Sequence, residues 1–155
     1  HKNTGRPLKE GKWFEKFSSN YLDVDNDALY PFGYGLSYTT FRFSDITLNR
    51  SSIGMDNELV ASVTVTNTGD RAGSEVVQLY IRDLVGSVTR PVKELKGFEK
   101  IYLQPNESRT VRFTIDPEML KFYNADLKFV AEPGDFDVMI GPDSRNVKTA
   151  RFTLR

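Results

Sequence analysis

The chain has 155 residues, one histidine, no cysteine, and 21 basic against 21 acidic side chains, so its formal net charge is zero. This balance argues against a nucleic-acid or anionic-membrane partner, because both need clustered excess Lys and Arg. The absence of cysteine excludes disulfides and Cys-based zinc sites. No apolar run approaches the roughly 20 residues that a membrane-spanning helix needs, and the length fits about one domain.

The first 40 residues are rich in aromatic side chains and show little periodic pattern. Ten of the 19 aromatic residues lie in the first 43, and the stretch LYPFGYGLSYTTF at 29–41 carries no charge. We interpret residues 1–40 as an extended arm. The sequence begins with His1 rather than Met and shows no signal peptide, so we expect an internal fragment or a processed chain.

From residue 41 onward the pattern predicts β-strands. Apolar and polar residues alternate over 58–67, 110–115, 136–140 and 150–155, which is typical of strands with one buried and one wet face. Residues 75–83 are apolar on both faces and predict a central strand. The predicted fold is an all-β sandwich. The predicted core consists of Val63, Val65, Val77 or Val76, Leu79, Phe113, Ile115, Phe136, Val138 and Phe152.

Turn signals separate these strands at 67–70, 103–108, 132–135 and 141–146, each rich in Gly, Pro, Asn or Asp. Residues 116–124 predict one short helical turn, because Asp116 is a suitable N-cap and Pro117 suits the first helical position.

A search for catalytic groups finds little. The single histidine, His1, lies at a terminus, where a fixed catalytic or metal role is disfavoured. Asp23, Asp25 and Asp27 have the spacing of a calcium loop, but the glycine and the final glutamate of such a loop are missing, which favours a solvated acidic turn. We predict no catalytic residue, no metal site and no cofactor.

The remaining polar candidates have structural interpretations. Asp83 and Glu99 are expected to form surface ion pairs with Arg82, Lys96 or Lys100. Two N-x-S sequons, at Asn49 and Asn106, lie at predicted turns, where turn chemistry is the better default for Asn.

Aromatic rings in the arm could also stack on sugars. The candidates are Trp13, Tyr21, Tyr30 and Tyr34. They are irregularly spaced and interleaved with glycines, which favours burial against another domain over a sugar platform.

Five blocks of the sequence resemble a known family in their order along the chain. These are NTGRP at 3–7, LYPFGYGLSYTTF at 29–41, VTVTNTGDRAGSEVVQLYIRD at 63–83, RPVKELKGFEKIYLQPNES at 90–108 and EPGDFDVMIG at 132–141. They are similar to the C-terminal end of glycoside hydrolase family 3 enzymes, and most similar to the bacterial periplasmic β-glucosidases of that family. The resemblance covers essentially the whole chain.

The resemblance implies a fibronectin type III-like (immunoglobulin-like) antiparallel β-sandwich at 41–155. Residues 1–40 would be the arm that leads from a preceding α/β domain. The parent enzyme would hydrolyse terminal β-D-glucosidic bonds with retention, in the periplasm or outside the cell. Its catalytic Asp and Glu would lie in upstream domains, because no position here matches their motifs.

The uncharged stretch would then pack at the interface with the upstream domains. The side chains expected to dock are Tyr30, Phe32, Tyr34, Leu36 and Tyr38. Two alternatives stay open, a carbohydrate-binding module and a protein-interaction module of fibronectin type. The expected partners are the upstream domains of the same chain, with no nucleic acid and no membrane.

Overall fold

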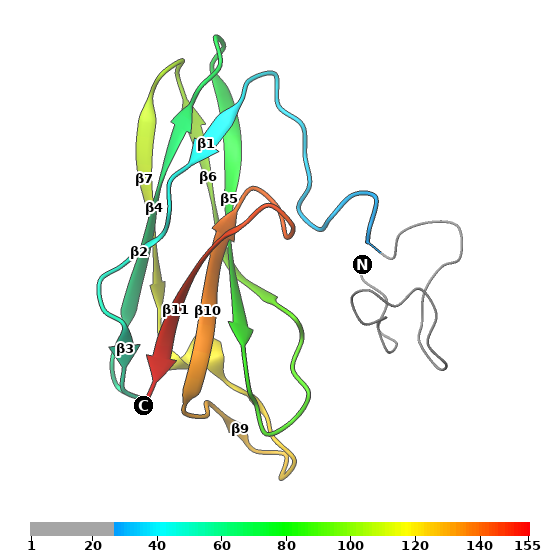
Figure 1. The fold of residues 1–155 in the computed structure, drawn as a ribbon, viewed down its shortest axis with the longest axis vertical. Coiled ribbons are helices and arrows are strands. Elements are labelled where there is room, and N and C mark those ends of the chain that lie inside the picture. The colour runs from blue at the N-terminus through cyan, green and yellow to red at the C-terminus, as the bar shows by residue number, and fades with distance from the viewer. Residues whose placement is uncertain (1–26) are drawn as a thin grey trace, which may run out of the picture.

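A computed structural model describes residues 27–155, which form a sandwich of β-strands (Figure 1). The predictions for His1, Trp13, Tyr21, Asp23 and Asp25 lie outside the described residues. The strands are β1 (Phe41–Phe43), β2 (Thr47–Leu48), β3 (Ser52–Ile53), β4 (Leu59–Asn67), β5 (Gly73–Asp83), β6 (Glu94–Leu103), β7 (Ser108–Ile115), β8 (Phe122–Tyr123), β9 (Phe129–Val130), β10 (Gly134–Gly141) and β11 (Lys148–Leu154).

The long strands form two sheets that enclose one core. In the first, here called sheet A, β4 pairs with β7 on one side and with the short strands β1 and β2 on the other. The second, sheet B, has the order β3-β11-β10-β5-β6. All pairings in the two sheets are antiparallel except β3 with β11. The prediction of an all-β sandwich is confirmed.

Alternation in the sequence identified the core correctly. In β4 the residues Leu59, Ala61, Val63 and Val65 are buried, and Val63 lies opposite the buried Val111 of β7. In sheet B, Phe136 and Phe152 lie opposite each other with ring centroids 5.4 Å apart. Val77 rather than Val76 faces the core, and Phe113 is half-buried against it. The other predicted core residues are buried.

Strand β5 is covered on both faces, as the sequence predicted. It lies between β10 and β6. Val77 and Leu79 point into the core, while Gln78 and Tyr80 alternate with them and are also buried, on the outer face of sheet B. A polar residue buried on an outer face needs a covering element with hydrogen-bonding groups.

Alternation alone did not identify β6. A bulge interrupts its pairing with β5: Gly97 lies opposite Leu79, but Leu95 lies opposite Tyr80, so Lys96 has no partner position. A bulge shifts the side-chain period by one residue and hides the pattern.

The short helical turn was predicted correctly. Pro117–Leu120 forms the 3-10 turn η1, and the Asp116 carboxylate accepts a hydrogen bond from Met119 N at 2.9 Å. Pro117 occupies the start of this turn, where its missing N–H costs nothing.

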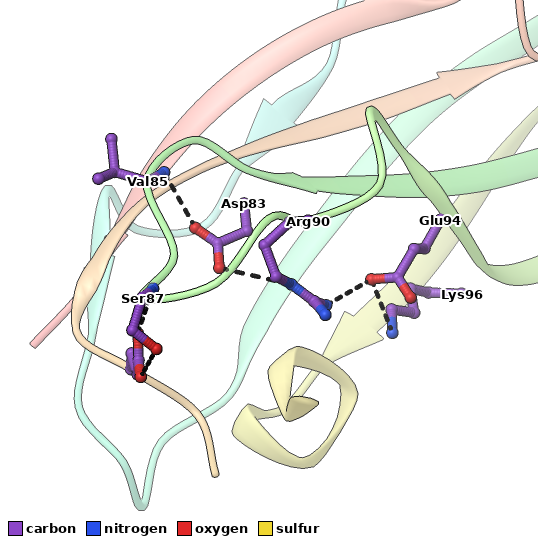
Figure 2. Close-up of polar contacts among 7 residues, drawn as sticks. Asp83, Val85, Ser87, Arg90, Glu94 and Lys96 are labelled. Carbon is purple, nitrogen blue, oxygen red and sulfur yellow. Dashed lines mark hydrogen bonds and ion pairs between the residues drawn. The ribbon is translucent and has the colours of Figure 1, made fainter. Parts of the chain in front are cut away.

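Asp83, at the end of β5, is paired differently from the sequence-based expectation (Figure 2). Its Oδ2 atom lies 3.8 Å from Arg90 Nε, and Arg90 Nη2 donates to Glu94 Oε2 at 2.8 Å. The guanidinium of Arg90 lies 4.2 Å from the centre of the Phe122 ring, a cation–π geometry. The expected surface pair for Asp83 is therefore wrong, because the loop at 84–93 brings Arg90 back over the carboxylate.

The tip of this loop is also fixed. Ser87 N and Ser87 Oγ donate to the two oxygens of Glu132, at 2.9 and 2.6 Å. These hydrogen bonds, the hydroxyl one first, lower the pKa of Glu132. The loop at 84–93 is thus held at its base and at its tip.

Replacing Arg90 with Met should destabilise the domain most strongly at neutral pH. Burial raises the pKa of Asp83, against the lowering effects of the Val85 amide and the Arg90 charge. A raised pKa means that the folded state binds the proton more tightly, so this group's contribution to stability falls as pH rises through the folded pKa. Without the Arg90 charge the pKa of Asp83 rises further, so the loss of unfolding free energy with rising pH is larger.

We expect R90M to lose about 1–3 kcal/mol of unfolding free energy at pH 7 and less at pH 4, measured by urea titration of the isolated chain. Arg82→Met serves as the control and should change little, because Arg82 is an exposed cation next to Asp83 on β5. Equal losses for R90M at the two pH values would show that Asp83 does not titrate as argued.

Candidate docking surface

The described part of the chain offers little for catalysis. Within 27–155, no group of three or more His, Asp or Glu side chains is arranged to hold a metal ion. Two open grooves of about 400 and 560 Å³ flank β1. Asp45 is the one carboxylate lining either groove, and Lys148 Nζ lies 3.0 Å from it. Neither groove therefore holds the carboxylate pair that a glycosidase needs.

No helix within residues 27–155 is long and apolar enough to cross a membrane.

The feature that stands out is residues 28–40, here called the connector, which run outside sheet B before β1 (Figure 1). The Gln78 side chain holds the middle of the connector. Its Nε2 donates to Gly33 O at 3.2 Å and also to Pro142 O, while its Oε1 accepts from the Tyr80 hydroxyl. The buried Gln78 amide is thus satisfied by one connector carbonyl, one turn carbonyl and one strand side chain.

Gly33 is required at this contact. Its φ is +80°, and a Cβ atom built there would lie 2.0 Å from Gln78 Oε1. A side chain would therefore be strained and would collide with the anchor. A turn bond from Tyr34 N to Pro31 O, 3.0 Å long, shapes the backbone around this glycine.

The turn between β10 and β11 provides a second anchor. Ser144 N donates to Phe32 O at 2.9 Å, and the Arg145 guanidinium donates to Ala28 O. Asp143 shapes this turn by accepting from the Arg145 and Asn146 amides at 2.8 Å each, and from Asn146 Nδ2. Burial acts to raise the pKa of Asp143, but the bonds from Asn146 and the Arg145 amide outweigh it and the pKa is lowered.

Asn67 fixes the end of the connector. Its Oδ1 accepts from Thr39 Oγ1 at 2.6 Å and from Gly69 N at 3.1 Å. Its Nδ2 donates to Arg71 O at 2.7 Å and to Leu103 O at 3.1 Å. Asn67 is fully buried, so losing any of these partners would leave a buried polar atom unpaired, which is costly.

Tyr80 has the most strongly displaced pKa at this site. Burial first, and the nearby Asp143 charge second, raise the pKa of its hydroxyl to about 12. The hydroxyl therefore keeps its proton at physiological pH and remains a donor to Gln78. Its role here is to hold the anchor rather than to exchange a proton.

The connector binds the sandwich through backbone carbonyls and the Thr39 hydroxyl, and it leaves its large apolar side chains outside. The five predicted docking residues expose between 44% (Tyr34) and 94% (Tyr38) of their surface. The rings of Tyr30 and Tyr34 lie 5.3 Å apart, inclined by 37°. The residues predicted to dock are Tyr30, Phe32, Tyr34, Leu36 and Tyr38, and all of them lie at the surface.

Of the two sequon asparagines, Asn106 lies in a turn, as the sequence indicated, whereas Asn49 bonds across to strand β4. Asn49 Oδ1 accepts from Val60 N at 2.9 Å. Asn106 adopts a left-handed φ of 63° in the turn before β7, and its amide donates to Asn67 O.

Sequence reasoning did not identify Gln78, Ser144 or Asn67 as anchors. The available signal was Gln78 itself, because a glutamine in the middle of a strand that is apolar on both faces must find buried partners. Ser144 and Asn67 act through a turn amide and through partners distant in sequence, which a local pattern does not reveal.

Comparison with known proteins agrees with this architecture. Residues 75–144 match the model of the fibronectin type III-like domain. The chain is 54% identical over 154 residues to a periplasmic β-glucosidase of Salmonella typhimurium, covering 99% of this chain and 20% of that protein. It is 50% identical over 139 residues to a putative β-xylosidase of Formosa agariphila, covering 90% of this chain and 18% of that protein.

Solved structures give the same result. A β-glucosidase from Listeria innocua, in complex with glucose, matches with a TM-score of 0.88 at 41% identity, covering 99% of this chain and 21% of that one. The chain spans about a fifth of the length of the relatives that it matches. It is a fibronectin type III-like domain that matches the C-terminal region of glycoside hydrolase family 3 β-glucosidases.

Proposed function

We propose that this chain is the non-catalytic docking domain of a glycoside hydrolase that cleaves terminal β-D-glucosidic bonds with retention, in the periplasm or outside the cell. The catalytic residues belong to upstream domains of the parent enzyme. The domain acts by holding the upstream domains in position through the connector, with Tyr30, Phe32, Tyr34, Leu36 and Tyr38 as the docking side chains.

One observation carries this proposal: the connector has a fixed backbone and outward-facing apolar side chains. A segment that merely linked two domains would not need the Gln78, Ser144 and Asn67 anchors. A segment that completed the core of the sandwich would point its rings inward. The observed arrangement presents a preorganised apolar surface, which reduces the entropy cost of binding.

The free energy of burying the connector side chains is large enough to hold two domains together. Burying an exposed Leu or Phe-sized side chain is worth roughly 1.5–3 kcal/mol, so several connector residues together supply several kcal/mol. Because the connector backbone is already ordered by the sandwich, less of this is lost to ordering the segment. An interdomain interface of this strength would fix the position of the upstream acid/base residue. A shift of about 1 Å in such a residue can reduce the rate about a hundredfold.

The alternative of a carbohydrate-binding module has less support. Relatives at 54% and 50% identity are named for different sugars, glucose and xylose. A domain so similar in both is not expected to select the sugar. The 37° inclination between the Tyr30 and Tyr34 rings also gives no single flat platform for a pyranose.

The isolated chain should not hydrolyse an aryl β-glucoside, because the grooves beside β1 lack a carboxylate pair. Release of the aryl alcohol is the measurement. Turnover that survives repurification and disappears in a single Asp or Glu variant of this chain would contradict the proposal.

The anchor can be tested with two neighbouring glycines. Gly33→Ala should detach the connector, because its Cβ would collide with Gln78. Gly35→Ala is the matched control, since a Cβ there meets nothing within 4 Å. We expect limited proteolysis of the isolated chain to cut within 28–38 about tenfold faster in G33A, a change that corresponds to about 1.4 kcal/mol. Identical cleavage rates in the two variants would show that Gly33 does not secure the connector.

The central test changes Phe32 and Tyr34 together to Ser in the parent enzyme. We expect the melting temperature to fall by several degrees and turnover to fall about tenfold or more, because the interdomain interface loses two buried rings.

The control is the Tyr123→Ser, Phe129→Ser double variant. These two rings lie on the hairpin of β8 and β9, 5.0 Å apart, and are about as exposed as Phe32 and Tyr34. The control should keep wild-type activity. Full activity and stability in the Phe32/Tyr34 variant, or glucan binding by the isolated domain through these rings, would replace docking with the carbohydrate-module alternative.

A further inference from the structure

The outer faces of the two sheets differ in chemistry. Sheet A presents hydroxyl-bearing side chains on its outer face, and these bond to one another: Thr64 Oγ1 lies 3.2 Å from Thr110 Oγ1, and Thr66 Oγ1 lies 2.8 Å from Ser108 Oγ. None of the exposed large apolar side chains in the described region belongs to β1, β2, β4 or β7. Sheet A is therefore built to face water.

Sheet B presents apolar side chains on its outer face, along β6. In register, Phe98 lies opposite Gln78, and Leu95 lies opposite Tyr80. Residues opposite each other in an antiparallel pair project to the same face, so Phe98 and Leu95 share the face to which the connector is bound. Tyr102, opposite Ser74, continues the same line.

These side chains are exposed although they belong to a strand of the sandwich. Phe98 exposes 69% and Tyr102 53% of its surface, and Leu95 is also exposed. Gln78 links the two surfaces directly, because it bonds to Gly33 of the connector and pairs in register with Phe98. The apolar surface of the connector thus continues onto β6.

A second chain of contacts joins Lys93, the residue before β6, to the connector. Lys93 Nζ donates to Ser144 O at 2.6 Å, and Ser144 N donates to Phe32 O at 2.9 Å. We define the β6 strip as Leu95, Phe98 and Tyr102.

We propose that the β6 strip is a second contact surface for the upstream domains of the parent enzyme, separate from the connector itself. This inference rests on the proposed docking function and extends it from a linker to a sheet face. The connector begins at Ala28, which the Arg145 guanidinium holds on this face, and the matched relatives are about five times as long as this chain. An upstream domain tethered here meets the strip at an effective concentration in the millimolar range, so three apolar side chains suffice.

The features of β6 argue against a second copy of the chain as the occupant. As the edge strand of sheet B it has unpaired backbone groups, the usual route to strand-to-strand association. The bulge at Lys96 and the charges of Lys96 and Lys100 disfavour such pairing. The strip therefore suits a partner that packs on the face of the strand rather than along its edge.

The test is the Phe98→Ser, Tyr102→Ser double variant, made both in the parent enzyme and in the isolated chain. Tyr123→Ser is the control, because Tyr123 is exposed to a similar extent, 66%, on the distant hairpin. In the isolated chain we expect the melting temperature to change little, since both side chains are already in water. In the parent we expect it to fall by about 5 °C, with Tyr123→Ser unchanged.

Each other outcome overturns the inference in a distinguishable way. If the strip variant behaves as wild type in the parent while the Phe32/Tyr34 variant is impaired, the connector docks and the strip does not. If neither variant has an effect, the docking function itself fails. If light scattering shows that the isolated chain is a dimer and that its strip variant is a monomer, the occupant is a second copy. Glucan binding that the strip variant abolishes would assign the strip to a sugar.

Discussion

The buried amide of Gln78 is the interaction on which the rest of this surface depends. A glutamine on the outer face of a sheet would normally point into water. Here it binds the carbonyls of Gly33 and Pro142 and accepts from Tyr80, so it joins the connector, the turn between β10 and β11, and the central strand. Because Gln78 binds the connector at a backbone carbonyl, this contact leaves the apolar side chains of the connector available for another surface.

Two further anchors hold the connector. Ser144 binds Phe32 through backbone atoms, and Asn67 holds Thr39 with an amide whose four hydrogen bonds are all made. Buried polar groups of this kind contribute little net energy when satisfied and cost much when one partner is lost. They therefore specify one path for the connector. Under the proposed function, the apolar side chains would set the strength of docking and the polar anchors would set its geometry.

Much of the fold could be predicted from the sequence, because alternation reports directly which face of a strand is buried. It identified the inward residues of β4, β7, β10 and β11, and it identified β5 as covered on both faces. It did not find β6, whose bulge at Lys96 breaks the period, and it assigned the wrong partner to Asp83, because Arg90 returns to it through a loop whose path is not encoded locally. The prediction that connector residues dock came from their aromatic content and lack of charge, whereas their anchors depend on contacts between distant segments.

Within the part of the chain that the structure describes, the outer faces of the two sheets differ in chemistry, and only one of them carries large exposed apolar side chains. Sheet A carries a bonded array of Thr and Ser, and sheet B carries the connector and the β6 strip. A free interaction module would have no reason to concentrate its apolar surface around the point where the preceding chain arrives. We therefore interpret the domain as a part that stabilises its own enzyme rather than as a receptor for a separate ligand.

Hydroxyl-radical footprinting tests the central claim most directly, because it reports the water accessibility of individual side chains. The isolated chain and the parent enzyme would be labelled under identical conditions and compared by mass spectrometry. The account predicts that Tyr30, Phe32 and Tyr34 are labelled in the isolated chain and strongly protected in the parent, while Tyr123 and Phe129 are labelled equally in both. Equal labelling of Tyr30, Phe32 and Tyr34 in the two proteins would contradict it.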